Sequence, residues 1–183
     1  CDRRATMDRS YAGTTQAGTN AITIPAASFT TGSITINGGD AFDSLTVDFT
    51  GGDPTKGQGL TWNGGNPTAN PGDSMTFSNG TFTNTVYTFD NLNDGNVSLD
   101  GVVFNYAGLE PITSNINATN VTLNYSAAAE TITVSNANGG QTTVRSTAGE
   151  VVKFNDPTGT LQINAGDTGV NKINLEALVN PYP

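Results

Sequence analysis

The stretch "INGGDAFDSLTVDF", residues 36–49, joins a glycine-rich turn to a strand-like run. Leu45, Val47 and Phe49 alternate with polar residues, and this two-residue period is typical of a β-strand with one buried face. The glycine pair before them tolerates the positive φ angles of a tight turn. The stretch therefore predicts a turn that leads into a strand, and it raises the question of whether the aspartates of the turn bind calcium.

The same apolar–Thr–apolar pattern recurs along the chain as "ITI", "LTV", "LTW", "MTF", "VTL" and "ITV". The chain contains 29 Thr, 22 Asn and 22 Gly; threonine favours strands, whereas asparagine and glycine favour turns. No window shows ten residues of helical periodicity. The sequence therefore predicts an all-β protein with strands over residues 21–24, 33–36, 44–49, 59–63, 74–78, 85–89, 96–99, 102–106, 120–125, 131–135, 142–146, 151–154, 160–163 and 172–175.

Two all-β architectures fit these short, regularly spaced strands. In a parallel β-helix, or β-solenoid, a repeated template places an apolar residue inward at equivalent positions of successive rungs. The alternative is an antiparallel β-sandwich, which the Asn-Gly pairs favour because Asn-Gly is typical of tight hairpins. These pairs lie at residues 37–38, 63–64, 79–80 and 138–139.

The shared strand template favours the solenoid. We expect one solenoid domain over residues 21–179, preceded by an extended N-terminal arm over residues 1–20 and followed by a C-terminal tail over residues 180–183. The arm shows no sustained apolar period.

Charge and composition exclude several classes of function. The formal net charge is −9, with seven basic residues and no histidine. So few basic residues cannot neutralise many phosphates, which argues against nucleic acid and an anionic membrane surface as partners. The lack of histidine removes the commonest general base and most zinc sites. Paired carboxylates can hydrolyse glycosides, but only Arg145 and Lys153 would assist them in the strand region, so we expect no enzyme.

The N-terminal arm carries the chain's other notable groups. Arg3, Arg4 and Arg9 make it basic while the rest of the chain is acidic. The arm is either a disordered terminus or a segment that docks onto a neighbouring subunit, and in the second case we expect these arginines to meet acidic residues of that subunit. Cys1 is the only cysteine, so no internal disulfide can form, and it is a candidate for lipid attachment or for a cross-link between chains. No apolar run is long enough for a transmembrane helix, and the composition fits an extracellular or cell-surface protein.

Residues 38–46 match part of the calcium-binding nonapeptide G-G-x-G-x-D-x-U-x, in which U is a large apolar residue. The match includes both leading glycines, Asp43 and Leu45, while Ala41 replaces the third glycine. Asp40 and Asp43 are therefore candidate calcium ligands. Two adjacent turns share each ion in this motif, and the best second copy, residues 164–175, is degenerate. A structural turn and a calcium site thus both remain open.

Two further sets of residues are candidate sites. Asp90 and Asp94 are further candidate calcium ligands, because they lie in the Asp/Asn-rich stretch "FDNLNDGN". This stretch lacks the bidentate glutamate of an EF-hand calcium loop. Asn117, Asn120 and Asn124 are clustered N-x-S/T sequons and are therefore glycosylation candidates. The aromatic residues mostly occupy alternating strand positions, which predicts that they pack in the core.

Much of the chain resembles a repeat unit of very large secreted and surface proteins of bacteria, of the haemolysin-type calcium-binding, haemagglutinin-like and adhesin-like kinds. The resemblance covers about residues 40–176, and its most specific pieces are "YAGLEPI" (106–112) and "FNDPTGTLQINAGD" (154–167). It implies an extracellular right-handed β-helix with a structural or adhesive role, and it implies no enzyme. A lone unit of a repeat architecture has exposed ends, so copies are expected to stack end to end.

These arguments favour an extracellular structural protein that forms a self-assembling filament or surface layer of identical subunits, or that belongs to an adhesin. The alternative is an adhesive module that binds cell-surface carbohydrate, with or without calcium. Calcium is the one cofactor that the sequence suggests.

Overall fold

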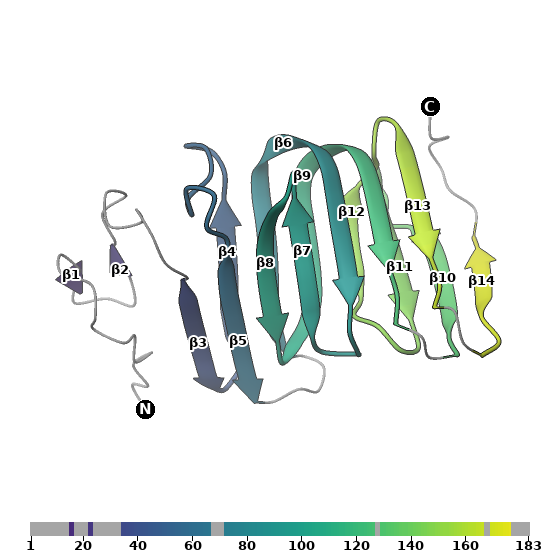
Figure 1. The fold of residues 1–183 in the computed structure, drawn as a ribbon, viewed down its shortest axis with the longest axis horizontal. Coiled ribbons are helices and arrows are strands. Elements are labelled where there is room, and N and C mark those ends of the chain that lie inside the picture. Colours follow the sequence, from purple (N-terminus) through teal and green to yellow (C-terminus); the bar gives the residue numbers. More distant parts are fainter. Residues whose placement is uncertain are drawn as a thin grey trace.

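The structure, a computed structural model, describes residues 15–16, 22–23, 34–66, 72–126, 129–166 and 169–176. The strands β1 (Thr15–Gln16) and β2 (Ile22–Thr23) pair with each other, and the other strands form one 12-stranded sheet (Figure 1). The part of the chain that the structure describes contains no helix, and thus none that could span a membrane. The prediction of an all-β chain is confirmed.

The 12 strands of the sheet lie mostly where the sequence predicts them. Their bounds are β3 (Thr35–Asp40), β4 (Ser44–Asp48), β5 (Leu60–Asn66), β6 (Asp73–Phe89), β7 (Gly95–Leu99), β8 (Val102–Ala107), β9 (Leu109–Asn124), β10 (Thr131–Asn136), β11 (Gln141–Ser146), β12 (Val152–Asn155), β13 (Thr160–Asn164) and β14 (Lys172–Leu175). The strands predicted over residues 74–78 and 85–89 are joined in the single strand β6. The first two-thirds of β9 were not predicted.

The sheet mixes parallel and antiparallel pairs. The strand order is β14-β10-β11-β12-β9-β6-β7-β8-β5-β3, with β13 beside β9 and β4 beside β6. The hairpins β6-β7-β8 and β10-β11-β12 are antiparallel, and all other pairs in the sheet are parallel. The structure therefore combines the parallel stacking of the predicted solenoid with the hairpins of the alternative sandwich.

Figure 1 shows the strands in two layers, and β6 and β9 each bend near the middle of the strand, at the top of the view, and pass from one layer to the other. The bend in β6 coincides with a register shift between Ser78 and Thr81. The core lies between the layers. Phe77 in the first half of β6 packs edge-on against Phe104 of β8, with 5.3 Å between ring centroids, and it is fully buried.

Apolar residues of successive parallel strands share columns inside the core. One column consists of Leu45, Met75, Ile112 and Val152. The last three are 0% exposed, and each fully buried apolar side chain stabilises the fold by about 1.5–3 kcal/mol. The repeated apolar–Thr–apolar template therefore forms stacked columns, as the solenoid interpretation expects.

Outward-facing asparagines form matching ladders on the surface. In each ladder the side-chain amide of the strand later in the chain donates to the side-chain carbonyl of the earlier strand. The donor, acceptor and distance are Asn63 to Asn37 (2.7 Å), Asn120 to Asn84 (3.0 Å) and Asn164 to Asn124 (2.7 Å). Such ladders require strands stacked in register, as in other stacked β-structures.

The Asn-Gly pairs predict hairpins correctly at only one of four places. The pair at 138–139 connects β10 to β11, with φ near 67° at both residues. The pairs at 37–38 and 63–64 lie inside the parallel strands β3 and β5, and the pair at 79–80 lies at the bend of β6. The hairpins expected from these pairs are therefore wrong at three positions: two pairs lie where parallel strands stack glycine on glycine, and the third forms the bend of β6.

The predicted arm and tail fall largely outside the described residues. Arg3, Arg4, Arg9 and Cys1 all lie there, as does the tail over residues 180–183. The domain bounds and the roles assigned to these residues stay predictions.

Candidate functional site

The chain crosses between the layers at a series of corners at the lower end of Figure 1. The first corner spans residues 37–44 and the second spans residues 63–74, of which 67–71 are not described. Both begin with Asn-Gly-Gly and end with Asp-Ser. Their strands pair in register, with Asn37 opposite Asn63 and Ser44 opposite Ser74. Residues 63–74 are therefore the corner that stacks on the first one in register, a relation that sequence reasoning missed.

Asp73 ties the second corner to the first. Its Oδ1 accepts a hydrogen bond of 2.7 Å from the backbone N–H of Asp43. In return, the N–H of Ser74 donates to the carbonyl oxygen of Asp43 at 2.9 Å. Asp73 is fully buried, and its Oδ2 has no partner among the described residues. Burial raises the pKa of Asp73, and the nearby Asp43 carboxylate raises it further, whereas the hydrogen bond from Asp43 opposes the shift.

The first glycine of each Asn-Gly-Gly makes room for the aspartate that ends its own corner. A Cβ on Gly64 would lie 2.6 Å from Cβ and from Oδ2 of Asp73, and equally close to the carbonyl oxygen of Gly108. A Cβ on Gly38 would lie 2.9 Å from Oδ2 of Asp43. The glycines therefore serve close packing here.

The last corner spans residues 164–172, of which 167–168 are not described, and its described part repeats the same pair of bonds. The N–H of Glu130 donates to Oδ1 of Asn171 at 3.1 Å. The N–H of Lys172 donates to the carbonyl oxygen of Glu130 at 2.9 Å. Asn171 thus plays the part that Asp73 plays in the second corner. The stretch that looked like a degenerate calcium repeat is a structural equivalent of the other corners.

The predicted calcium ligands are only partly brought together. Asp40 ends β3 opposite Asn66, and Asp43 is brought to Asp73 rather than to a third acid. Within the described ranges no three acidic, histidine or cysteine side chains form a group that could hold a metal. Calcium takes six to eight oxygen ligands, and this corner offers two carboxylates with turn carbonyls. The contacts are those of a structural turn, and calcium binding stays a prediction.

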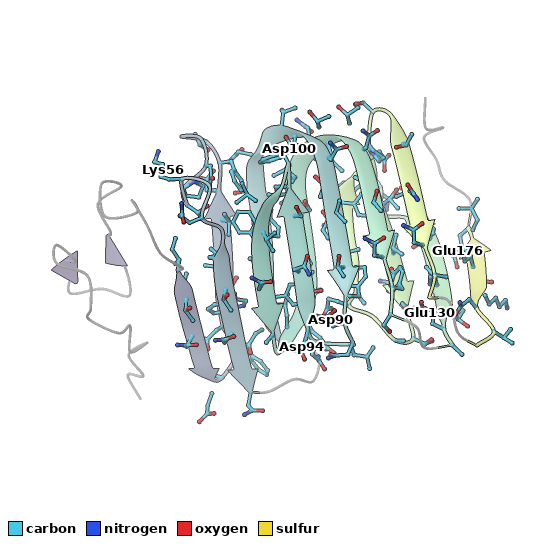
Figure 2. The ribbon with its side chains drawn as sticks, viewed as in Figure 1. Lys56, Asp90, Asp94, Asp100, Glu130 and Glu176 are labelled. Atoms are coloured by element: carbon cyan, nitrogen blue, oxygen red, sulfur yellow. The ribbon has the colours of Figure 1, made fainter. Side chains whose placement is uncertain are left out.

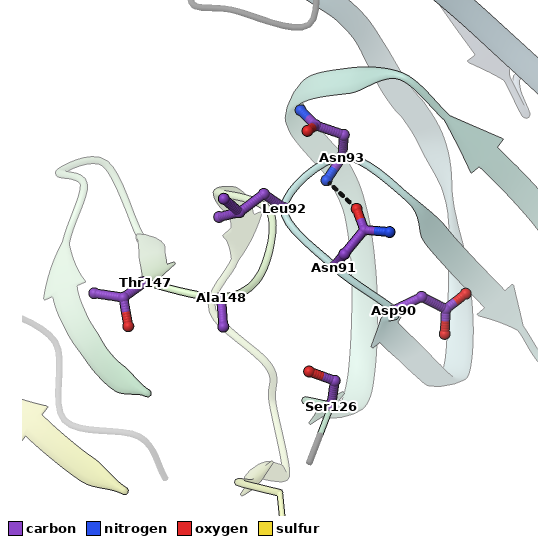
Figure 3. Close-up of a pocket in the computed structure, with 7 residues that line it drawn as sticks. All are labelled: Asp90, Asn91, Leu92, Asn93, Ser126, Thr147 and Ala148. Carbon is purple, nitrogen blue, oxygen red and sulfur yellow. Dashed lines mark hydrogen bonds between the residues drawn. The ribbon is translucent and has the colours of Figure 1, made fainter. Parts of the chain in front are cut away.

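Asp90 and Asp94 lie in the turn between β6 and β7, at the lower end of the sheet (Figure 2). Oδ1 of Asp94 accepts a 3.0 Å bond from the N–H of Gly108, and Oδ2 accepts a 2.8 Å bond from Asn91. Both oxygens of Asp94 therefore hold the turn together. Asp90 lines an open pocket of about 530 Å³ together with Asn91, Leu92, Asn93, Ser126, Thr147 and Ala148 (Figure 3).

Two buried glutamates lie at the same end of the sheet, and sequence reasoning missed both. Glu150 is 1% exposed, and its Oε2 has no partner among the described residues. Burial raises the pKa of Glu150 to about 8; the N–H of Val151 lowers it and the Glu110 carboxylate raises it. Glu130, also buried, accepts a short hydrogen bond from the hydroxyl of Ser146. No feature of their sequence neighbourhood distinguishes these acids from exposed ones.

The glycosylation candidates lie on the outer face of β9. Oδ1 of Asn117 accepts a bond from Asn155, and Asn120 and Asn124 belong to the amide ladders. A glycan on Asn120 would have to leave from the nitrogen that donates to Asn84, between strands about 4.8 Å apart. Glycosylation of the three stays a prediction.

The aromatic residues pack in the core, as predicted. Trp62, Phe77, Tyr87, Phe89, Phe104, Tyr106 and Phe154 are all buried, and Phe82 packs against them. Buried rings cannot stack on a sugar at the surface, so the structure gives the carbohydrate-binding alternative no aromatic platform among these residues.

The two ends of the sheet are the remaining candidate site. We call β3 and β4 the N-terminal edge, and β13 and β14 the C-terminal edge. Within the 12-stranded sheet, each of these strands pairs on one side only. Ile173 and Leu175 of β14 are 52% and 73% exposed, although both carry large apolar side chains.

Comparison with protein-family models, curated proteins and solved structures finds no match to this chain. The resemblance to large secreted repeat proteins therefore rests on the sequence stretches quoted above.

Proposed function

We propose that this chain is an extracellular structural protein whose copies associate through the edges of the sheet into a filament or surface layer. The observation that carries the proposal is the exposure of Ile173 and Leu175 on a strand that, among the described residues, is paired on one side only. Unpaired backbone groups beside exposed apolar side chains are a template for pairing with another chain.

The proposal includes a finer description of the fold, a right-handed solenoid flattened into two layers. Its support is the parallel columns, such as Met75 over Ile112, and the amide ladders outside them. The antiparallel hairpins are then insertions within two of the turns. Such a stack can grow by adding rungs, which suits a structural or adhesive role at a cell surface.

The proposal assigns no reaction to the chain, and it uses calcium only as an accessory at the first corner. The same edges would serve within an adhesin, where each would meet another repeat.

Negative-stain electron microscopy and analytical ultracentrifugation of the full chain test the proposal. We expect regular assemblies, both in calcium and in a chelator. Assemblies only in calcium would make the first corner an ion site and retain the structural role. Monomers at every concentration and in both conditions would overturn the proposal.

A pair of variants sharpens this test. The double variant Ile173→Lys, Leu175→Lys places two charges on the C-terminal edge and should abolish assembly. Val103→Lys is the matched control, because Val103 is 41% exposed on β8, which is paired on both sides. We expect Val103→Lys to assemble normally. Equal loss of assembly in both variants would mean that the edge is not the contact.

A further inference from the structure

We infer that the copies join head to tail, with β14 of one copy paired in parallel with β4 of the next, and β13 with β3. Asp43 of the next copy then binds Asn171 as Asp73 binds Asp43 within the chain. This inference rests on the proposed function, because it specifies the contact through which the copies assemble. Four features of the two edges lead to it.

The first feature is strand direction. β3, β5 and β8 run parallel to one another. β7 is antiparallel to both β8 and β6, so β6, β9 and β13 run in the same direction as β3. Likewise β4, β6, β9 and β12 are parallel, and two antiparallel steps through β11 lead to β10 and β14. The arrows of Figure 1 agree: β3 and β13 point down, and β4 and β14 point up. A second copy placed beyond the C-terminal edge by translation therefore presents parallel strands in both layers.

The second feature is the unfinished corner bond at each edge. In both completed corners, a backbone N–H donates to the side-chain oxygen of the equivalent residue one turn later: Asp43 to Asp73, and Glu130 to Asn171. In the first corner the residue equivalent to Asp73 and Asn171 is Asp43. Its carboxylate has no hydrogen-bond partner among the described residues. At the other edge the backbone N–H of Asn171 also has none. Head-to-tail contact brings these two groups together.

The third feature is the sense of the amide ladders. In all three ladders the later strand donates to the earlier one. Asn37 accepts from Asn63, and its own amide nitrogen has no partner in the described part of the chain. Asn164, at the other edge, donates to Asn124. Asn37 of the next copy can therefore donate to Asn164 and continue the ladder in the same sense.

The fourth feature is the apolar column. Ile173 and Leu175 pair with Ile132 and Val134, which are 0% and 1% exposed. If Asn171 and Asp43 of the next copy form the same corner bond as Asp43 and Asp73 within the chain, Ser44 of the next copy lies opposite Lys172. This pair sets the register of the remaining residues. Leu45 and Val47 of the next copy then cover Ile173 and Leu175. The first and second corners already differ in length while their strands stay in register, so the shorter first corner fits on the last one.

Such a contact joins two different surfaces of the same molecule. A heterologous contact related by translation does not close, so it generates a filament rather than a dimer. Each copy would continue the sheet of the one before it in both layers. The contact surface is therefore two strand edges and one corner.

Cysteine cross-linking tests this register. All variants carry Cys1→Ser, which removes the native thiol. Thr46→Cys with Asn174→Cys places one cysteine on each edge, at positions that the register puts opposite each other. Neighbouring strands lie about 4.8 Å apart, within the Cα separation of a disulfide. We expect mild oxidation of assembled protein to give a ladder of covalent multimers on a non-reducing gel.

The matched control is Ser44→Cys with Asn174→Cys, because Ser44 lies on the same side of β4 but two residues out of register. The Cα atoms would then be separated by roughly 8 Å, too far for a disulfide. We expect at least tenfold less cross-linked product. Single variants should stay monomeric on the gel, and an equimolar mixture of Thr46→Cys and Asn174→Cys should give mixed dimers only.

The outcomes separate the inference from the proposed function. If the protein assembles normally but a single-cysteine variant forms disulfide dimers, like edges pair with each other. That result would overturn the head-to-tail contact and leave the proposed function standing. Equal cross-linking of the test pair and its control would overturn the register. Protein that neither assembles nor cross-links would remove the proposed function together with the inference.

Discussion

The middle of the stack and its C-terminal end contain the same kind of strand in different surroundings. Ile132 and Val134 of β10 are 0% and 1% exposed, whereas their register partners Ile173 and Leu175 are 52% and 73% exposed. The side chains are equally apolar, and the two strands are adjacent. The presence of a further strand, rather than the choice of residue, therefore decides whether the column is buried.

The corners show the same contrast in their polar groups. Asp73 lies inside the stack, is fully buried and accepts the N–H of the preceding turn. Asp43 is the equivalent residue at the N-terminal edge, and its carboxylate has no preceding turn to bind within the described sheet. The chain thus places stack-forming residues at both ends, where they would serve contact with another copy.

The largest expected effect on the free energy of unfolding comes from shortening an isoleucine in the middle of the stack, compared with the same change at its C-terminal edge. Ile112→Ala removes a fully buried side chain from the middle of a column and should lower the free energy of unfolding by about 2–5 kcal/mol. Ile173→Ala at the edge should cost less than about 1 kcal/mol, since half of its surface is already in water. Urea denaturation at concentrations where the protein is monomeric measures both. Equal costs would mean that the edge is as well packed as the middle.

The next largest effect is a dependence of stability on pH. The pKa of Glu150 is raised to about 8 by burial, above its ordinary value of 4.5. The folded state therefore binds a proton that the unfolded state has released, and stability should fall as pH rises from about 4.5 to 8. We expect a loss of a few kcal/mol across this window, measured by urea denaturation at a series of pH values.

Glu150→Gln should remove most of this pH dependence, because the amide does not ionise. Glu176→Gln is the control, since Glu176 is exposed at the C-terminal edge and should leave the slope unchanged. A wild-type stability that is flat between pH 5 and 8 would show that Glu150 ionises without cost and that the lower end of the core admits water.

A smaller effect is expected from filling the space beside Asp73. Gly64→Ala would place a Cβ 2.6 Å from the aspartate and from the carbonyl oxygen of Gly108. Overpacking of this kind costs about 1–3 kcal/mol. Gly51→Ala is the control, because its Cβ would meet nothing within 4 Å. If thermal denaturation shows equal stability for the two variants, the second corner is looser than its contacts indicate.

The strands could be predicted from the sequence wherever the apolar–Thr–apolar pattern is intact. The first part of β9 was missed because Pro111 and the inward-facing Ser114 interrupt that pattern. Proline is typical of strand edges and ends, and here the neighbouring strands on both sides stabilise the strand in spite of it. Local pattern cannot show support that comes from residues far along the chain.

The corners could be predicted only in part, for a related reason. The motif at residues 38–46 was found, but its structural partner at residues 63–74 was not, because the second corner is longer and has no fixed spacing of glycine and aspartate. Stacking equates Asp43 with Asp73 through strand register, which sequence spacing does not record. The buried glutamates were missed because nothing local distinguishes them.

The smallest effect on folding, and the most informative, should come from the two equivalent aspartates. Asp73→Ala removes the acceptor of the Asp43 N–H and should lower the free energy of unfolding by about 1 kcal/mol. Asp43→Ala should leave the stability of the monomer unchanged, because its carboxylate has no partner among the described residues. Urea denaturation of dilute protein measures this difference.

The order should reverse when assembly is measured. Asp43→Ala removes the acceptor offered to Asn171 of the preceding copy, so sedimentation should show weaker association at an unchanged monomer stability. Asp73→Ala leaves both edges intact and should assemble like wild type once folded. If Asp43→Ala destabilises the monomer and assembles normally, the Asp43 carboxylate belongs to the fold of its own chain, and the first corner is not a contact between copies.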